Sequence, residues 1–212
     1  MKISGVSNKQ DKFDAQMFLK TLVKSVLCGF IICTAISFSE FDAQSREISN
    51  NIFRLHILAD SDSTQAQALK LMVRDRVQEC CAEIFSSCAS KEEAEAAARE
   101  NLDLICDEAR KVLRKAGSGS EVRGEITNMY FTTRVYGDVT LPAGNYDALR
   151  LTIGSGRGHN WWCVMYPPIC ISASEAEISD VLDPRQTSLV TDESVQYKFK
   201  IYELYENLVN KF

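Results

Sequence analysis

The sequence predicts an α+β fold, in which a long antiparallel helix hairpin and a C-terminal helix pack on a mostly antiparallel sheet. The hydrophobic periodicity changes from alternation over residues 51–60 to spacings of three and four over residues 63–117. From residue 122 the sequence is β-rich, and residues 196–212 are again amphipathic at helical spacing. The 212 residues, 45% hydrophobic and 25% charged, are ordinary for a chain with one folded core.

Residues 1–40 are predicted to be a cytoplasmic N-terminus followed by a hydrophobic signal peptide or anchor. Lys20 and Lys24 precede an uncharged run, Ser25–Ser39. This run is shorter than the roughly 20 apolar residues of a spanning helix and is typical of the central part of a signal peptide. Small residues near its end suit cleavage, while its apolar character also suits an uncleaved anchor. Either alternative exports residues 51–212 as a single extracytoplasmic domain.

The charge distribution argues against binding to nucleic acid. The chain carries a formal net charge of -5. Up to Lys24 five lysines outnumber Asp11 and Asp14 by three, so the remainder carries -8. An acidic domain repels a phosphate backbone. A contact with the membrane is expected only through the N-terminal hydrophobic segment.

The first strand and the first long helix are predicted from residues 51–85. Asn51–Asp60 alternates in polarity, which predicts a strand with one well-buried face. Asp62 is the predicted N-cap of the helix that follows, with Gln65 three residues later, as in a capping box. Apolar residues at spacings of three and four then predict a helix over residues 63–85.

A second helix is predicted between Ser90 and Gly117. Ser90 and Glu93 make the S-x-x-E pattern of a capping box, and Gly117 follows a basic last turn. The short segment between the two helices predicts an antiparallel hairpin.

The C-terminal half is predicted to be mostly strands. Residues 122–137 and 146–154 have β-rich composition and flank a turn at Leu141–Gly144. Residues 173–194 are polar and are predicted to form a loop. Residues 196–212 are predicted to form the final helix.

The stretch GHNWWCVMYPPIC, which begins at Gly158, contains the residue types of a cysteine nucleophile site. In that interpretation Cys163 attacks, His159 or His56 removes its proton, and Asn160 or Asp60 orients the imidazole. The apolar residues on either side of Cys163 disfavour its thiolate, and we therefore expect no catalytic residue here.

A metal site would use His159, Cys163 and Cys170, with His56 as a fourth ligand. Their spacing does not match the paired C-x-x-C pattern of structural zinc sites, so no metal is expected. The glycines of GSGRGHN lack the G-x-G-x-x-G spacing and the P-loop lysine of nucleotide sites. No cofactor is predicted.

The structural interpretation assigns the same stretch to a strand and a bend. Cys163 and Cys170 either close a disulfide across the Pro-Pro step or remain buried thiols. Six cysteines lie outside the leader, and their fifteen full pairings leave the connectivity open. The strand is expected to end at Tyr166, before the prolines, with Trp161 and Trp162 on opposite faces.

Three segments resemble the stage II sporulation protein R family. They are RLHILADSDSTQAQALKLMVRDRV, YGDVTLPAGNYDALRLTIGSGRGHNWWCVMYPPIC and YKFKIYELYE, in this order behind one hydrophobic leader. The most specific parts are RLHILA, LPAG with the following Y and ALR, and GHNWWCV with the following PP and C.

This resemblance implies a signalling protein of endospore-forming bacteria, exported from the forespore into the space between forespore and mother cell. It would there activate the membrane-embedded aspartic protease that processes the precursor of sigma-E. The alternative is an extracytoplasmic cysteine-dependent or metal-dependent cell-wall hydrolase. Because tryptophan and arginine are enriched at interface hot spots, the candidate partner contacts are Arg157, His159, Trp161 and Trp162.

Overall fold

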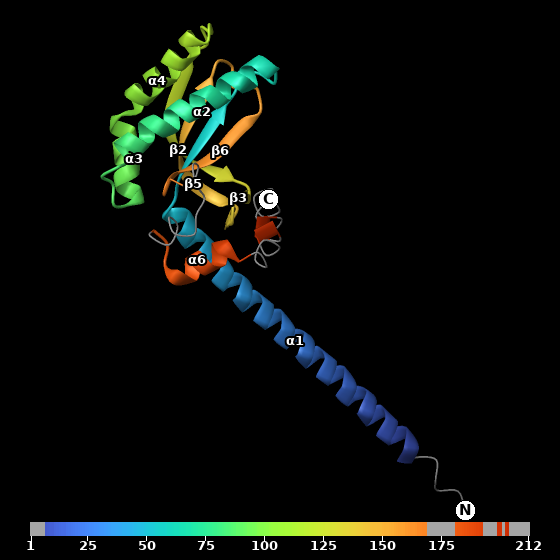
Figure 1. Cartoon of the computed structure of the whole chain (residues 1–212). Coiled ribbons are helices and arrows are strands. Elements are labelled where there is room, and N and C mark those ends of the chain that lie inside the picture. The colour runs from blue at the N-terminus through green and yellow to red at the C-terminus, as the bar shows by residue number, and fades with distance from the viewer. Residues whose placement is uncertain (1–6, 169–180, 193–198, 201, 204–212) are drawn as a thin grey trace, which may run out of the picture. The chain divides into compact units, whose positions relative to one another are not determined.

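The computed structural model describes residues 7–168, 181–192, 199–200 and 202–203. The chain forms two compact units, residues 1–43 and residues 44–212 (Figure 1). Helix α1 spans Ser7–Asn50. Its residues up to Ala43 belong to the first unit, and its last turns, from Gln44, belong to the second unit.

Helix α1 contains an apolar segment that is long enough to cross a membrane. The segment lies within Met17–Asn50, reaches a mean hydropathy of 1.9 and is not buried by the protein. A signal peptide and a membrane anchor share these properties. The leader predicted to end at residue 40 lies in this helix, and the helix itself continues to Asn50 and places Ile48 in the core of the second unit.

A four-stranded sheet forms the centre of the second unit. It contains β1 (Phe53–Leu58), β2 (Val122–Phe131), β5 (Gly144–Ile153) and β6 (Asn160–Tyr166), in the spatial order β2-β5-β1-β6. The pairs β2–β5 and β1–β6 are antiparallel, and β1–β5 is parallel. The predicted α+β class and the mostly antiparallel sheet are therefore confirmed.

Strand β1 is buried on both faces, whereas the alternation of its sequence predicted one buried face. Arg54 is fully buried and His56 is 3% exposed. The prediction was wrong because the sheet is covered on both sides, so the polar positions of a central strand have no route to solvent.

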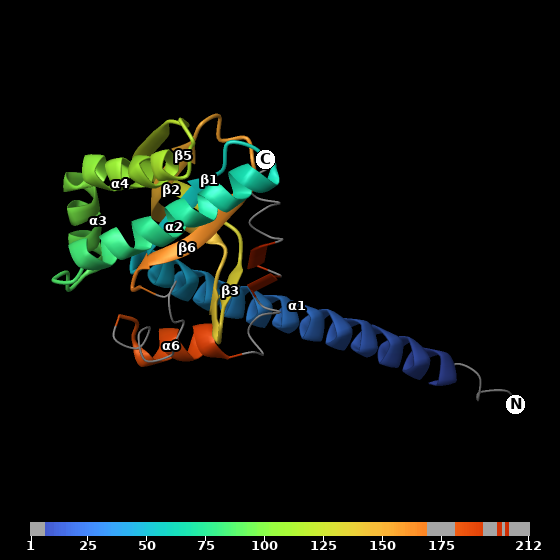
Figure 2. The same cartoon turned by 45° about the horizontal axis from the view of Figure 1, so that its top comes forward.

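Three helices cover one face of the sheet (Figures 1 and 2). They are α2 (Thr64–Ile84), α3 (Lys91–Glu100) and α4 (Leu102–Lys115). Their small and aliphatic side chains meet the apolar positions of the sheet in one cluster, which includes Phe53, Leu55, Ile57, Val73, Val77, Ala98, Ile105, Ala109, Leu113, Leu149, Leu151 and Ile153. The predicted helix hairpin is present in this layer.

Two details of the helix layer differ from the prediction. Ser63, not Asp62, is the N-cap of α2, and its Oγ accepts a hydrogen bond from the N–H of Ala66 at 3.1 Å. The second predicted helix is broken at Asn101, whose side-chain amide donates to the carbonyl of Ala97 at 2.8 Å. An asparagine that bonds the local backbone in this way competes with helix continuation.

The other face of the sheet is covered by the end of α1, a hairpin of β3 (Arg134–Tyr136) and β4 (Val139–Leu141), and α6 (Pro184–Thr191). The second core cluster on this side includes Ile48, Ile52, Phe131, Val139, Leu141, Tyr146, Leu182 and Val190.

Helix α6 lies inside the segment predicted to be a loop, so that prediction was wrong. Asp183 accepts hydrogen bonds from the N–H groups of Arg185 and Gln186, and the Gln186 side chain closes a capping box. Pro184 occupies the first turn, where its missing N–H has no cost. The D-P-x-Q pattern at Asp183–Gln186 indicates a helix start, although the polar composition of the segment suggested a loop.

Part of the predicted C-terminal helix is described. Phe199, Lys200, Tyr202 and Glu203 are helical, and Phe199 and Tyr202 are buried. Glu203 accepts a hydrogen bond from the N–H of Thr133 at 3.3 Å. The remaining residues of 196–212 lie outside the described part of the chain.

Candidate functional site

The loop between β5 and β6, residues 154–159, is fixed to the chain that follows β1. The carboxylate of Asp60 accepts a hydrogen bond from the N–H of Ser155 at 2.6 Å, and the Ser155 hydroxyl donates to the Asp60 carbonyl at 2.7 Å. The N–H of Gly158 donates to the carbonyl of Ala59 at 2.9 Å. This segment is therefore a built loop, held at several points along its length.

The glycines of the loop are required by close backbone approach. Gly154 has φ of 56°, and a Cβ there would lie 2.3 Å from the Asp60 carboxylate. A Cβ on Gly158 would lie 2.2 Å from the carbonyl oxygen of Ser61. Neither position has room for a side chain, so both require glycine. The glycines thus serve the docking of the loop against residues 59–61.

His159 and Asp62 form an exposed pair at the end of this loop. The Asp62 Oδ1 atom lies 2.6 Å from the backbone nitrogen of His159 and 2.5 Å from its Nδ1. The backbone N–H of His159, followed by its ring, holds the pKa of Asp62 below its usual value. Because Ser63 caps α2, the Asp62 carboxylate is available for this contact, which the prediction of Asp62 as the cap did not anticipate.

Lys70 supports the same end of the loop from helix α2. Its side chain is buried, and Nζ donates to the carbonyl of His159 at 3.0 Å and to Oε1 of Gln67 at 2.6 Å. Burial lowers the pKa of Lys70, and the nearby carboxylate of Asp62 opposes that effect. Because a buried ammonium group needs hydrogen-bond acceptors, the bond from Lys70 to the His159 carbonyl stabilises one position of the loop.

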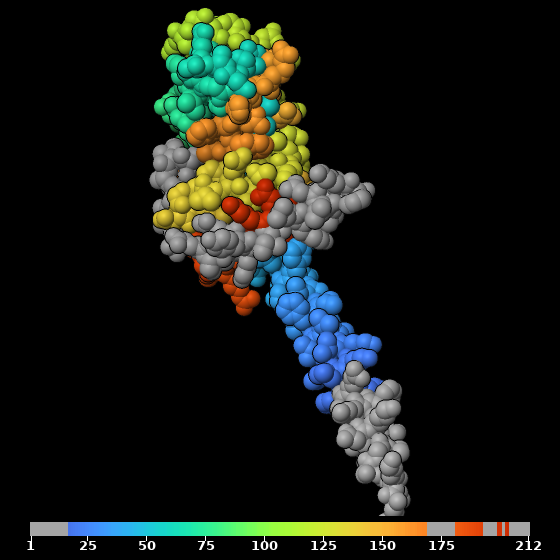
Figure 3. Space-filling view, turned by 90° about the vertical axis from the view of Figure 1, so that its right-hand side faces the viewer, coloured from blue at the N-terminus to red at the C-terminus, as the bar shows by residue number. Residues whose placement is uncertain are grey.

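An open hollow of about 510 Å³ lies beside the loop, between β6 and the β3–β4 hairpin, and we call it the arginine hollow. Figure 3 shows the hairpin region in yellow next to the β6 region in orange. The residues that line the hollow are Asp62, Arg134, Arg157, Gly158, His159, Asn160 and Trp162. They come from the segment between β1 and α2, from β3, from the β5–β6 loop and from β6.

Trp162 is held firmly on the side of the hollow. Its ring stacks on His56 with centroids 4.0 Å apart and meets the edge of Phe131 at 4.8 Å. The guanidinium of Arg134 lies 5.6 Å from the same ring. The indole of Trp162 therefore presents a fixed aromatic surface next to an exposed cation.

Trp161 lies on the opposite face of the sheet, as the alternation of a strand predicted. It packs against the helix-side core, with the guanidinium of Arg74 4.4 Å from its ring. Both indoles are half-buried. Of the four predicted contact residues, Arg157, His159 and Trp162 line one hollow and Trp161 does not.

Four residues that line the hollow were absent from the predicted contact set, namely Asp62, Arg134, Gly158 and Asn160. Arg134 comes from a short strand that precedes the loop by some twenty residues, and no local pattern indicates that it lies near Trp162. Asp62 was assigned to a helix cap. Its neighbour Ser63 is the equally good capping residue that could have indicated the alternative role.

Beneath the hollow, β1 carries an arginine in an aromatic cage. The guanidinium of Arg54 lies 4.2 Å from the centroid of Phe131 and 4.8 Å from that of Tyr146. Its Nη2 donates to the Tyr136 hydroxyl at 2.5 Å, and that hydroxyl donates to the carbonyl of Trp162 at 3.3 Å. Arg54 thus connects the hairpin to the strand that carries Trp162.

His56 is buried beside this cage in its neutral form. Neither ring nitrogen has a hydrogen-bond partner in the described part of the chain. Burial, followed by the charge of Arg150, lowers the pKa of His56 from 6.5 to about 4. The ring serves as a flat packing surface for Trp162. His56 therefore supports the wall of the hollow by packing against Trp162 and not by a hydrogen bond or a charge.

The cysteine nucleophile site is not assembled by these residues. Cys163 is buried in the helix-side core and its sulfur is in a disulfide, whereas His56 stacks on Trp162 on the other face of the sheet. His159 is paired with Asp62. Cys170 lies outside the described residues, so the bridge between Cys163 and Cys170 stays a prediction.

The other described cysteines are free thiols. Cys80, Cys81 and Cys106 are buried, Cys88 is half-buried, and burial raises the pKa of each. Within the described ranges, no three His, Cys, Asp or Glu side chains gather as metal ligands. The thiols behave as apolar side chains in this setting.

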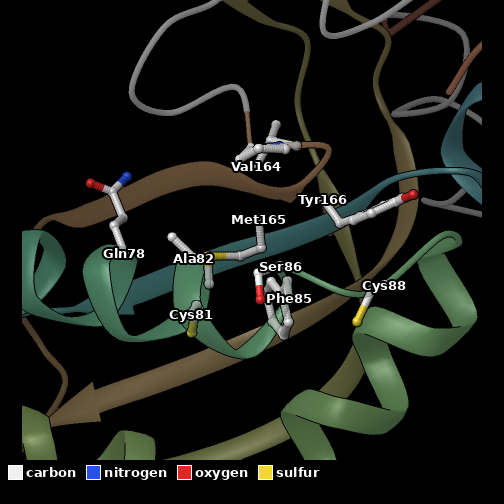
Figure 4. Close-up of a pocket in the computed structure, with 10 residues that line it drawn as sticks. Gln78, Cys81, Ala82, Phe85, Ser86, Cys88, Val164, Met165 and Tyr166 are labelled. Atoms are coloured by element: carbon white, nitrogen blue, oxygen red, sulfur yellow. The ribbon is translucent and has the colours of Figure 1, made fainter. Parts of the chain in front are cut away.

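A smaller apolar hollow of about 280 Å³ lies between the end of α2 and β6 (Figure 4). Phe85, Ala82 and Cys81 line it from the helix, and Met165 and Tyr166 line it from the strand. It lies on the helix side of the sheet, on the face opposite Trp162.

Comparison with known proteins assigns the chain to a family. Residues 49–176 match the family model for stage II sporulation protein R. The chain belongs to the stage II sporulation protein R family. It is similar to the stage II sporulation protein R of Bacillus subtilis (strain 168), with 38% identity over 123 residues. These residues are 58% of this chain and 55% of that relative, so the match spans about half the length of the relative. No solved structure matches the chain.

The family match includes the arginine hollow. Residues 49–176 contain every residue that lines it, together with the supporting residues Arg54, His56 and Tyr136. Helix α6 and the described C-terminal residues lie beyond the matched range. The sporulation role predicted from the motifs is thus supported at the level of the family.

Gly158→Ala is expected to destabilise the second unit by ~2 kcal/mol or more, because the new Cβ would overlap the backbone carbonyl of Ser61. Urea unfolding of the full chain in detergent, followed by near-ultraviolet circular dichroism, measures the change. Gly119→Ala is the matched control, because a Cβ there meets nothing within 4 Å. Equal stability of the two variants would contradict the close docking of the loop.

Acid is expected to destabilise the protein through His56. The unfolded chain binds a proton at this residue below pH 6.5, and the folded chain does so only near pH 4. The free energy of unfolding should therefore fall by up to ~3 kcal/mol between these pH values. His56→Phe should remove this part of the loss, and His159→Gln, at the other histidine of the chain, should retain it. Parallel acid curves for wild type and His56→Phe would argue against the assignment.

Proposed function

We propose that this protein is an exported sporulation signal that activates a membrane-embedded aspartic protease, which then processes the precursor of sigma-E in the mother cell. The family match is the single observation that supports this role. The N-terminal apolar helix is compatible with export through a signal peptide or with an anchor. The signal would act from the space between forespore and mother cell.

The surface around the arginine hollow is the proposed contact with the protease. It combines the exposed side chains of Arg157 and His159 with a half-buried tryptophan, Trp162, in a region positioned by the sheet. Interface hot spots favour arginine and tryptophan on rigid supports. Trp161 is part of the same strand but lies on the helix-side face, outside this proposed contact.

The alternative function, a cysteine-dependent or metal-dependent cell-wall hydrolase, would need a reactive thiolate or a metal. The disulfide of Cys163 and its position on the face opposite His56 favour the signalling role.

Delivery outside the cytoplasm is expected to be required for function. The full chain, co-expressed with the protease and the sigma-E precursor, should trigger processing of the precursor. A form that begins at Gln44, the first residue of the second unit, and stays in the cytoplasm should not, whereas the same form behind an unrelated signal peptide should restore processing. Immunoblots of the precursor and mature forms measure the outcome. Processing by the cytoplasmic form would overturn the proposed topology.

Cys163→Ser is expected to weaken folding by roughly 2–4 kcal/mol, because it removes a disulfide from a buried position. The variant that does fold should still trigger processing, because no bond to Cys163 is made or broken in signalling. Thermal melting and the processing assay on the same variant separate the two effects. A variant that melts like wild type and has lost all function would support the nucleophile interpretation instead.

A further inference from the structure

The arginine hollow contains two cations that lack a carboxylate partner within the described residues. Arg157 makes one side-chain bond, from Nε to the Ser155 hydroxyl at 3.3 Å. Arg134 contacts the face of Trp162. Both side chains are exposed, and both line the same hollow. Their guanidinium groups therefore have N–H donors available for a ligand.

Among the described residues that line the hollow, Asp62 is the one carboxylate, and it is already engaged. Asp62 accepts from both the backbone and the ring of His159, and Lys70 lies close enough to lower its pKa. The carboxylate of Asp60 also interacts electrostatically with Arg157, and Lys70 does so with Asp62. The formal charge of the two arginines, Lys70 and these two carboxylates together is still positive. This positive site is on a chain whose part beyond Lys24 carries -8, so it is a local exception to the charge of the protein.

The hollow is pre-organised on its aromatic side. Trp162 is fixed by His56 and Phe131, and its carbonyl is held by the Tyr136 hydroxyl. The loop on the other side is held by Asp60 and Lys70. Binding of a ligand here would therefore carry only a small entropic cost, because the walls of the hollow are already ordered. Two arginine forks beside a fixed indole suit a planar anion that carries an apolar stem.

From this arrangement we infer that the arginine hollow is a binding site for the side-chain carboxylate of an acidic segment of a partner protein, which, if the proposed function holds, is the protease. A carboxylate fits better than a phosphate dianion, because the nearby charge of Asp62 opposes a second negative charge. The acidic character of the domain also disfavours an anionic membrane surface as the occupant. Arg134 and Arg157 donate to the carboxylate, and Trp162 packs against its methylene stem.

The direct test is a titration of the full chain in detergent micelles with a capped hexapeptide in which glutamate alternates with serine. The same peptide with glutamine in place of glutamate is the ligand control. We expect the glutamate peptide to bind at least about tenfold more tightly than the glutamine peptide, and Arg134→Gln and Arg157→Gln each to weaken its binding by about tenfold. Equal affinity for the two peptides would overturn the inference.

Arg114→Gln is the matched protein control. Arg114 is exposed and lines a separate hollow near the end of α4, together with Arg110 and Arg123. Its replacement changes the net charge by the same amount and should leave the affinity unchanged. An equal loss of affinity in Arg114→Gln would mean that binding depends on overall charge, which overturns the site. Arg134→Lys should recover only part of the affinity, because lysine lacks the two-pronged donor geometry.

The processing assay distinguishes failure of this site from failure of the proposed function. If wild type triggers processing, Arg134→Gln and Arg157→Gln should reduce its rate and Arg114→Gln should not. Processing at the wild-type rate in both arginine variants would overturn the site while the proposed function stands. If wild type triggers no processing, the proposed function fails and the peptide titration alone decides the site. Binding to phosphatidylglycerol vesicles that depends on Arg134 and Arg157, without binding to the peptide, would assign the hollow to lipid and overturn the inference.

Discussion

Strand β1 has neighbouring strands on both edges and packed layers on both faces, and the rest of the second unit depends on this position. Its apolar side chains Phe53, Leu55 and Ile57 join the helix-side core. Its polar side chains Arg54 and His56 meet the aromatic residues on the other side. The residues that follow it, 59–62, then hold the loop between β5 and β6. One strand therefore links the two cores and the candidate site.

Burial of Arg54 and His56 has a cost that the surrounding residues reduce only in part. Among the residues that the structure describes, none makes a hydrogen bond to Nη1 of Arg54 or to either ring nitrogen of His56. The π faces of Phe131 and Tyr146 offset part of the desolvation of the guanidinium, and His56 avoids a charge by remaining neutral. Arg54 binds the hairpin through Tyr136, and His56 sets the plane of Trp162.

The sequence predicted the parts of the fold that follow from local periodicity. The strand around His56, the helix after Ser63, the end of the strand at Tyr166 and the opposite faces of the two tryptophans all depend on patterns within a few residues. Sequence patterns over a few residues can also be compatible with more than one local structure. Ser63 and Asp62 are both good N-caps, and the choice between them depends on His159, which lies almost one hundred residues away.

The elements that were missed depend on contacts distant in sequence or on a short signal in polar surroundings. The break at Asn101 follows from one side-chain hydrogen bond, and α6 follows from the capping box of Asp183 and Gln186. The position of Arg134 beside Trp162 follows from the packing of the β3–β4 hairpin through Tyr136 and Arg54. Local periodicity contains no information on that contact.

The arginine hollow is built from segments that are far apart in the sequence, so it forms only when the second unit is folded. Its walls come from the segment that follows β1, from β3, from the β5–β6 loop and from the start of β6. The residues that support these walls belong to both layers of the second unit. Lys70 holds the loop from the helix layer, whereas Tyr136 holds the strand from the hairpin layer. A peptide that copied residues 154–162 would lack Arg134, the stacked His56 and the anchor at Asp60. The arrangement of donors and indole therefore exists only when the whole unit has folded, which couples recognition at this surface to the integrity of the domain.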